Sequence, residues 1–267
     1  MTATTGDTLV TVHEEDALGI ITLRRPERRN AMTRDLIRQL IAATAEVSDR
    51  DALRAVIIEA EGDTFSVGAD LNEVEAMIKP PSLLRARKEA ELGGQMMRSI
   101  RDIHQPTVCA VQGVATGGGA CIAAACDFRV GAADCQAGLG EVRMAMNLMW
   151  HALPYFVDLL GPARAKQMLM SGALFPASTL ANWGFLDETC DRQALAMTAR
   201  TRAGTFVDLP PVAVQMMKRS INRYAQALGE SVMHMDHDQW LLTASSADFQ
   251  DALLAFSEKR KPNPRGH

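Results

Sequence analysis

The strongest constraint on the fold is a strand-like segment that leads into three consecutive glycines. Apolar and β-branched residues fill 107–111, and Gly117, Gly118 and Gly119 follow shortly after. Small apolar residues then continue without a charge as far as Asp127. This order predicts a strand, a tight turn and a buried helix. The first amides of a helix lack intrahelical partners, so the turn could bind a phosphate or a developing oxyanion, or serve only close helix–sheet packing.

Strand-like and helix-like segments alternate along the rest of the chain. The predicted strands are 9–12, 18–23, 55–58, 107–111, 127–130 and 185–186, with 14–16 as a hairpin turn. The predicted helices are one capped by Thr33, one running from the Pro80–Ser82 break to about His104, one from Gly161 to Gly172, and one over 176–184. Repeated strand–turn–helix units predict an α/β fold with a parallel core sheet and right-handed crossovers. We therefore expect a strand-rich core over 1–190 and a helical region over 191–267, broken at Pro210–Pro211 and Gly229.

Composition excludes several classes of function. The 267 residues suit one large domain or a domain with a small appendage, and the net charge of −4 gives no indication of nucleic-acid binding. The N-terminus lacks a signal-peptide pattern, and no run of about 18 apolar residues predicts a membrane span. Five cysteines without CxxC spacing indicate reduced thiols, hence a cytoplasmic protein with neither a disulfide framework nor a metal site. The close pair His234 and His237 is interpreted as part of a solvated helix face.

A second glycine turn accompanies the first. Residues 65–70 follow the apolar strand 55–58, and residues 116–120 follow 107–111. Each turn could offer one backbone N–H to a single carbonyl oxygen. Two such amides form an oxyanion hole, in which each donor contributes about 3–4 kcal/mol when charge develops on the oxygen. Neither turn has the Walker pattern or the dinucleotide GxGxxG fingerprint.

Four segments, taken in order, resemble the enoyl-CoA hydratase/isomerase (crotonase) family along nearly the whole chain. They are Arg25-Pro26-Glu27-Arg28-Arg29-Asn30-Ala31-Met32, Phe65-Ser66-Val67-Gly68-Ala69-Asp70-Leu71, Gln112-Gly113-Val114-Ala115-Thr116-Gly117-Gly118-Gly119 and Phe256-Ser257-Glu258-Lys259-Arg260. The resemblance implies a spiral of βαβ units with a helical C-terminal region that assembles homotrimers, often paired as dimers of trimers. It also implies an acyl-CoA thioester as substrate, with coenzyme A as part of that substrate and no separate cofactor.

The same resemblance assigns residues to the site. The amides of Val67 and Gly118 match the family's two oxyanion donors. The residues expected to contact the substrate are Arg28, Ala31, Ala69, Asp70, Leu71, Gly117, Cys121, Trp150, His151, Phe256 and Lys259. Of these, Ala69 to Leu71 would follow the adenine, and Phe256 and Lys259 match positions that reach the CoA of a neighbouring subunit. Arg28, Arg29 and Lys259 could equally be ordinary exposed charges.

The catalytic carboxylates depart from the hydratase pattern. Hydratases carry one glutamate just after the triple glycine and a second about twenty residues later. Here the first position is Cys121 and the second is Glu141, so one carboxylate remains. The further acidic position of dienoyl-CoA isomerases falls on Met149. Glu141 lies in an apolar stretch, so we expect it to be the general acid/base, with a raised pKa.

Three functions remain open from the sequence. Glu141 alone could move a proton between two carbons and so isomerise an enoyl-CoA double bond, which is the favoured interpretation. It could instead support hydration, with a backbone group, a thiol or His151 holding the water. The protein could also bind acyl-CoA without turnover. For Cys121, a small core residue competes with a thiol activated by the helix dipole. His151 is interpreted mainly as a packing residue, and 144–150 as apolar pocket lining or core.

Overall fold

Six strands form the main sheet of the structure, a computed structural model that describes residues 7–73 and 82–267. The strands run in the order β1 (Val10–Glu15), β2 (Leu18–Leu23), β3 (Ala55–Ala60), β4 (Thr107–Val111), β6 (Phe128–Ala132) and β9 (Glu188–Cys190). β1 pairs antiparallel with β2, and every later pair is parallel. β4 is buried along its whole length, as expected of a parallel strand covered on both faces. The predicted parallel core sheet is confirmed.

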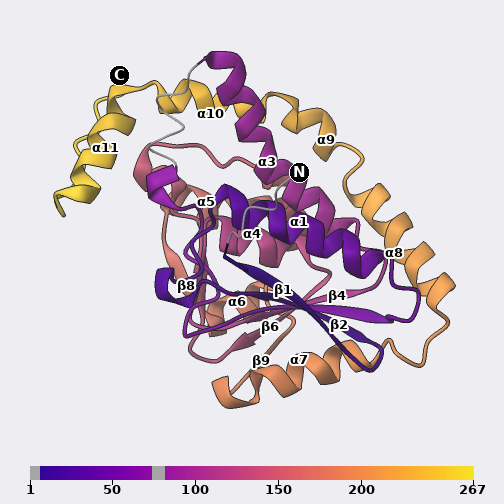
Figure 1. Cartoon of the computed structure of the whole chain (residues 1–267). Coiled ribbons are helices and arrows are strands. Elements are labelled where there is room, and N and C mark those ends of the chain that lie inside the picture. Colours follow the sequence, from indigo (N-terminus) through magenta and orange to yellow (C-terminus); the bar gives the residue numbers. More distant parts are fainter. Residues whose placement is uncertain (1–6, 74–81) are drawn as a thin grey trace.

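Helices cover both faces of this sheet. α1 (Arg34–Ser48) and α3 (Leu83–Arg101) pack against each other on one side, and α7 (Leu195–Gly204) packs against β3, β4 and β6 on the other (Figure 1). Thr33 and Ser82 cap α1 and α3 as predicted, since each hydroxyl oxygen accepts the amide three residues further on. α7 thus covers one face of the core sheet, although it belongs to the predicted helical C-terminal region.

A second, three-stranded sheet positions the glycine-rich turn. Its order is β5 (Val114–Thr116), β7 (Gln136–Gly138) and β8 (Leu174–Pro176), and the sequence analysis did not predict it. α4 (Gly118–Ala125) begins directly after β5 and is buried throughout. The N–H of Gly117 donates to the carbonyl of Gly138, at 3.2 Å. This sheet therefore brings the triple-glycine turn close to the segment that carries Glu141.

The helix predicted from Gly161 to Gly172 is confirmed, but two other boundaries are wrong. α5 (Leu153–Ser171) consists of two helices that meet at a kink at Gly161, where φ +69° and ψ +163° are not helical, and the sequence analysis did not predict the first of them. Residues 185–186 are buried core rather than a strand, and the strand β9 follows them. The hairpin turn is at Asp16, because Glu14 and Glu15 belong to β1. The predicted break at Pro80–Pro81 lies outside the described residues.

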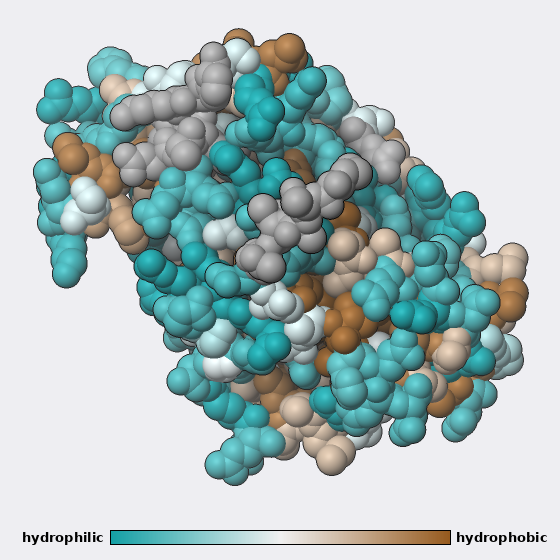
Figure 2. Space-filling model, in the orientation of Figure 1, coloured by the Kyte–Doolittle hydropathy of each residue, from teal (hydrophilic) through white to brown (hydrophobic). Residues whose placement is uncertain are grey.

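The C-terminal region continues as helices along the outside of the molecule. After α6 (Ala177–Trp183) and α7 come α8 (Pro211–Ala225), α9 (Gly229–Val232), α10 (Asp236–Ala244) and α11 (Ala247–Ser257). The short 3-10 helices are η1 (Pro26–Arg28), η2 (Glu141–Met144), η3 (Arg192–Ala194) and η4 (Met233–Met235). The predicted helical character ends at Ser257, and 261–267 have no regular structure. Figure 2 shows apolar side chains at the edge of the molecule where Figure 1 places α8. Within the described ranges, no helix is long and apolar enough to cross a membrane.

Candidate active site

Two glycine turns meet at the carboxyl ends of the neighbouring strands β3 and β4. Ser66 and Ala115 form a parallel bridge between the turns. Gly68, with φ +85°, sits so close to the other turn that a Cβ atom there would lie 2.9 Å from the carbonyl oxygen of Thr116 and 3.1 Å from the nitrogen of Gly118. Only glycine permits both this conformation and this approach. The predicted convergence of the two turns is therefore present.

The amide of Val67 is not available to a ligand. Its N–H donates to the carbonyl of Arg29, at 3.2 Å, and Val67 does not line the cavity described below. The prediction that Val67 supplies an oxyanion donor is wrong for this structure. The sequence pattern located the turn but not which of its successive amides faces outward.

The backbone N–H of Ala69, unlike that of Val67, is not bonded to the early loop. Ala69 bridges Met32 in a parallel arrangement, in which the hydrogen bonds use the flanking carbonyl of Gly68 and the N–H of Asp70. The N–H of Ala69 itself therefore points away from Met32. Both Ala69 and Gly118 line the same cavity, and Gly118 is the first residue of α4, where an N–H has no intrahelical partner.

Glu141 faces these turns from the start of η2. Its Oε1 lies 3.0 Å from the position that a Cβ atom would take on Gly117. Oε2 is buried and has no hydrogen-bond partner among the described residues. Burial raises the pKa of Glu141 to about 7, against a small opposing effect of a backbone hydrogen bond. The predicted rise in pKa is confirmed, and both protonation states of Glu141 are accessible near neutral pH.

The cavity beside Glu141 has a volume of about 100 Å³. Its lining is mostly apolar and comes from the two turns, α1, α3, α4, α10 and the loop after η2. The lining residues are Met32, Arg34, Ile37, Ala69, Asp70, Glu73, Glu89, Ala90, Leu92, Gly93, Gly118, Cys121, Glu141, Met146, Asn147, Leu148, Met149, Trp150 and Trp240. The interpretation of 144–150 as pocket lining is confirmed for 146–150. Trp240 and Ala90 were not anticipated, because they come from elements remote in sequence without a chemical motif. Met32 ends the first family-like segment, but the sequence analysis gave it no role.

Cys121 is a buried residue at the cavity wall, exposed to only 1%. Burial raises the pKa of its thiol well above the ordinary value, and the nearby carboxylates of Glu141 and Asp236 raise it further. The hypothesis of a thiol activated by the helix dipole is therefore wrong. The alternative, a small core residue, agrees with the structure.

The early loop is tied to the first glycine turn by buried polar groups. Arg25 donates to the carbonyl of Ala31, at 2.8 Å, and to Oδ2 of Asp70, at 2.7 Å. Burial opposes ionisation of Asp70, but hydrogen bonds from Arg25 and the amide of Asn72 outweigh it and hold the pKa of Asp70 below its ordinary value. Asp70 thus secures its own turn, as the sequence suggested. Sequence reasoning gave no role to Asn30, whose fully buried amide joins the same network.

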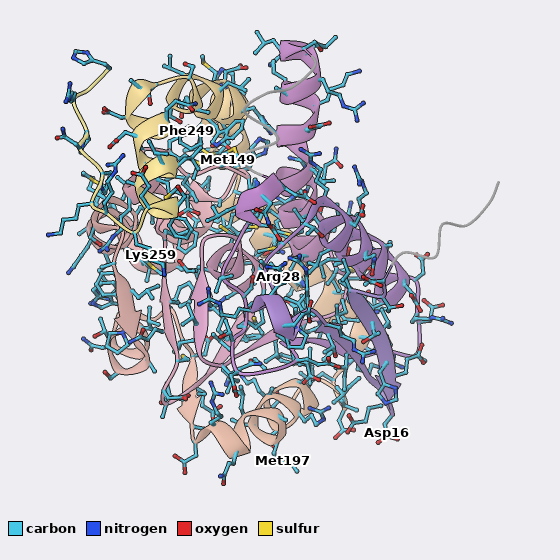
Figure 3. The ribbon with its side chains drawn as sticks, turned by 60° about the vertical axis from the view of Figure 1, so that its left-hand side comes forward. Asp16, Arg28, Met149, Met197, Phe249 and Lys259 are labelled. Atoms are coloured by element: carbon cyan, nitrogen blue, oxygen red, sulfur yellow. The ribbon has the colours of Figure 1, made fainter. Side chains whose placement is uncertain are left out.

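Other predicted contacts lie away from the cavity. Arg28 is exposed on η1, and Lys259 is exposed just after α11 (Figure 3). Phe256 is exposed on α11. None of the three lines the cavity. Leu71 is half-buried beside Asp70 and also does not line it. Their predicted contacts with CoA, including those across subunits, stay predictions.

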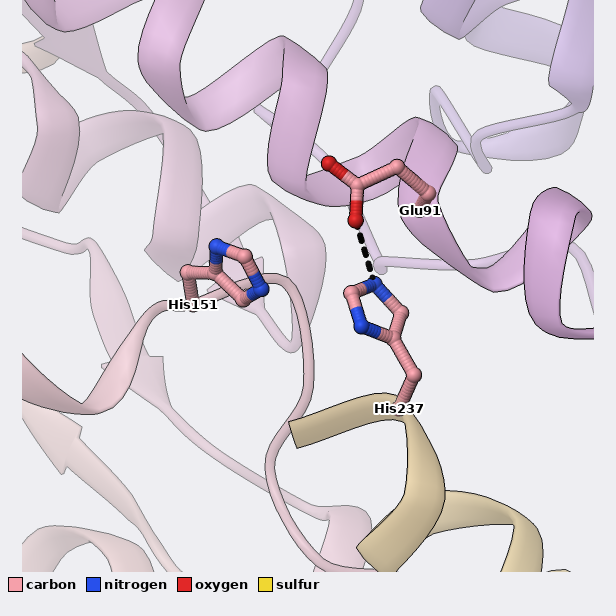
Figure 4. A group of neighbouring side chains, drawn as sticks. All are labelled: Glu91, His151 and His237. Carbon is pink, nitrogen blue, oxygen red and sulfur yellow. Dashed lines mark ion pairs between the residues drawn. The ribbon is translucent and has the colours of Figure 1, made fainter. Parts of the chain in front are cut away.

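Glu91, His151 and His237 form a cluster (Figure 4), with ligand-type atoms within 4.8 Å of one another. Nε2 of His237 lies 2.9 Å from Oε2 of Glu91. Arg98 pairs with Glu91 and lies 2.9 Å from Nδ1 of His151. Because a guanidinium only donates, Nδ1 must accept and the proton of a neutral His151 lies on Nε2.

This arrangement is a hydrogen-bonded anchor rather than a set of free ligands. Burial lowers the pKa of His151, and the Arg98 guanidinium acts in the same direction, so its imidazole is neutral near pH 7. With its proton on Nε2, the neutral imidazole of His151 presents no lone pair there to a cation. His151 packs, as the sequence suggested. His237 is buried against Glu91, so the interpretation of a solvated face is wrong for it, whereas His234 is exposed.

Parallel strands that end in two converging glycine turns, with one buried carboxylate facing them, define a crotonase-type protein. A family model described as enoyl-CoA hydratase/isomerase matches residues 13–266, and the chain belongs to this family. It is 28% identical to a short-chain-enoyl-CoA hydratase of Clostridium acetobutylicum, over 94% of this chain and 95% of that one. It is 25% identical to a 1,2-epoxyphenylacetyl-CoA isomerase of Escherichia coli, over 95% and 97% of the two chains.

The fold is also shared with solved structures. An enoyl-CoA hydratase/isomerase from Xanthobacter autotrophicus superposes with a TM-score of 0.86, at 23% identity, over 94% of this chain and 93% of the other. The likeness at this level of identity concerns the fold. It agrees with the spiral of βαβ units that the sequence resemblance implied.

Proposed function

We propose that this protein is an enzyme of acyl-CoA thioesters that isomerises enoyl-CoA double bonds with Glu141 as its single general acid/base. The observation that carries the proposal is the buried carboxylate of Glu141, which faces Gly117 with a pKa raised to about 7. A base with a pKa near the working pH is suited to remove and return one proton. Coenzyme A enters as part of the substrate, and no separate cofactor takes part.

The amides of Ala69 and Gly118 are proposed as the oxyanion hole. In the reaction, the carboxylate of Glu141 takes a proton from C2 of a 3-enoyl-CoA, and the electron pair moves through the thioester to its oxygen. The two amides stabilise that negative charge where it develops. Glu141 then returns the proton to C4, the electron pair forms the C2–C3 double bond, and the enzyme is regenerated.

Hydration is the second candidate, because the relatives at 28% identity are named short-chain-enoyl-CoA hydratase and crotonyl-CoA hydratase. Hydration would require Glu141 to hold and activate the water molecule without a second carboxylate. The Cys121 thiol, in place of a second glutamate, is neutral and a weak hydrogen-bond donor. The missing carboxylate therefore favours isomerisation.

One set of assays separates these functions. The protein is incubated with a 3-enoyl-CoA and with crotonyl-CoA, and the conjugated thioester absorbance is followed. We expect it to appear from the 3-enoyl-CoA, faster than it disappears from crotonyl-CoA. Glu141→Gln should lower kcat about 10²- to 10⁴-fold, and kcat/KM of the wild type should rise with pH through about 7. Activity that survives Glu141→Gln would overturn the mechanism, and binding without turnover would indicate a non-catalytic acyl-CoA carrier.

We further propose that the protein works as a homotrimer or a dimer of trimers. The exposed apolar side chains of α8 support this, since Val212, Met216 and Ile221 would otherwise face water.

A further inference from the structure

The indole of Trp150 fills the space between α3 and the start of α4. A Cβ atom on Gly93 would lie 2.0 Å from Cδ1 of Trp150, and a Cβ atom on Gly118 would lie 2.2 Å from Cζ3. The ring is therefore packed against two glycines, one edge on each. Since Gly118 carries a proposed oxyanion donor, the benzene edge of Trp150 lies directly beside the place where the thioester would bind.

The backbone that presents Trp150 is unusual. Trp150 and His151 have φ values of +70° and +56°, a left-handed pair in two bulky residues. Such a conformation persists only where the surroundings enforce it, and it is concentrated at functional sites. The ring is almost fully buried, with 9% exposure, although it lines the cavity.

Asp236 of α10 supplies the enforcement. Its Oδ2 accepts the amide of His151, at 3.0 Å, and the amide of Trp150 also donates to this carboxylate. Asp236 is itself buried, with 2% exposure. The side chain of His151 is held in turn by Arg98 and packs edge-on against His237, with ring centroids 5.1 Å apart (Figure 4). Trp150 is thus fixed from both its ring and its backbone.

The space that Trp150 leaves is small. The cavity has a volume of about 100 Å³, and the indole of Trp150 forms part of its wall. Met146, Leu148 and Met149 also line it, so this part of the cavity suits an apolar group.

We propose that Trp150 is the specificity-determining residue that limits the acyl chain, and that it restricts the site to short acyl groups. This inference rests on the proposed function, because it assumes that an acyl-CoA occupies the cavity. Asp236 acts as a positioning residue that keeps the indole over Gly118.

The test measures binding without turnover. The whole protein is titrated calorimetrically with butanoyl-CoA, octanoyl-CoA and free CoA. We expect the wild type to bind octanoyl-CoA about tenfold or more weakly than butanoyl-CoA, because four extra methylenes find no space. In Trp150→Gly, which keeps the left-handed backbone and removes the ring, this preference should be lost while the affinity for free CoA is retained. Trp150→Phe, a smaller change, should give an intermediate ratio.

Trp183→Phe serves as the matched control, because this tryptophan packs on Phe175 and does not line the cavity. It should keep the wild-type ratio. Equal binding of the two acyl-CoAs by the wild type, or an unchanged ratio in folded Trp150→Gly and Trp150→Phe, would overturn the inference without touching the proposed chemistry. Failure of the wild type to bind any of the three ligands would overturn both. Loss of turnover with the expected binding ratios would overturn the proposed function alone.

Discussion

At the scale of the residue, Glu141 combines burial with the lack of a charged partner. A buried carboxylate is stabilised in its neutral form unless a cation or several donors compensate for lost hydration. Oε2 has no partner among the described residues, and the only opposing influence on the pKa is one backbone hydrogen bond. The fold thus keeps a carboxylate that can hold or release a proton near neutral pH, beside amides that could accommodate the charge of an enolate.

This burial has a measurable cost in stability. The pKa of Glu141 rises from 4.5 to about 7 on folding, so between these values the folded protein holds a proton that the unfolded chain has lost. The contribution of Glu141 to the free energy of unfolding is therefore fully present below about pH 4.5 and is lost as the pH rises to about 7. Glu141→Gln should therefore be more stable than the wild type at pH 8, by at most about 3 kcal/mol, and equal to it at pH 4.

Urea unfolding at both pH values, followed by circular dichroism, checks this expectation. Glu27→Gln is a suitable control, since Glu27 is exposed on η1. A difference between wild type and Glu141→Gln that does not grow with pH would contradict the burial of an ionisable carboxylate.

Cys121 should be inert in the folded protein. Its raised pKa and its 1% exposure both disfavour a thiolate that a reagent could reach. With iodoacetamide at pH 9, peptide mass spectrometry should find Cys121 unmodified while the partly exposed Cys190 is alkylated. Alkylation of Cys121 at a rate like that of Cys190 would show that the thiol is accessible.

The residue-level predictions from the sequence succeed where chemistry fixes the residue type. The single carboxylate at Glu141, and the cysteine at 121 in place of a glutamate, can be read directly from the sequence. The choice of amide in the first turn is not, because Val67, Gly68 and Ala69 differ only in the direction of their N–H groups. That direction is set by a bridge to Met32, more than thirty residues away in sequence.

At the scale of the element, the loop after η2 is shaped by contacts with α3 and α10. Each left-handed residue costs about 1–2 kcal/mol, so Trp150 and His151 need compensation from the buried carboxylate of Asp236. Gly93 and Gly94 leave the space for both side chains, because the lack of a Cβ brings α3 close to the indole of Trp150 and the imidazole of His151. Sequence patterns could not connect these segments, because a Gly-Gly pair inside a helix carries no sign of what it packs against.

Removing the Asp236 carboxylate should release this loop. In Asp236→Ala two buried amides lose their acceptor, which should lower stability by about 1–3 kcal/mol. The discriminating result is the ratio of octanoyl-CoA to butanoyl-CoA affinity, which should rise towards that of Trp150→Gly. Asp236→Asn keeps one acceptor oxygen and should keep the wild-type ratio. An Asp236→Ala variant that is destabilised but has an unchanged ratio would mean that Asp236 is only structural.

The misplaced element boundaries have a related origin. Gly161 and Pro162 start a helix, as their local pattern indicates, but a further helix that was not predicted precedes the kink at Gly161, where Tyr155 and Phe156 pack in the core. The apolar pair Phe185 and Leu186 was interpreted as a strand, but it is buried as a core connection and β9 follows with more polar residues. In both cases tertiary packing decided between local alternatives of similar energy.

At the scale of the whole molecule, the C-terminal helices divide into two groups. α7 is part of the sheet's cover, whereas α8 to α11 run along the outside of the molecule (Figure 1). Several of their apolar side chains are exposed. None of the residues of α8 is buried, although Val212, Met216, Met217 and Ile221 are apolar and exposed. Exposed apolar side chains gathered on one helix in this way indicate an interface.

The proposed trimer can be tested on α8 directly. The wild type should sediment at three or six times the chain mass of 29.0 kDa. Met216→Glu combined with Ile221→Glu should shift it to the monomer, because charges buried at a subunit contact carry a large desolvation penalty. Met197→Glu on α7 is the matched control, since Met197 is as exposed as Met216, at 69% against 65%, but stands on the sheet's outer cover (Figure 3). It should leave the mass unchanged. A monomeric wild type, or a double variant that keeps the wild-type mass, would exclude α8 as the subunit contact.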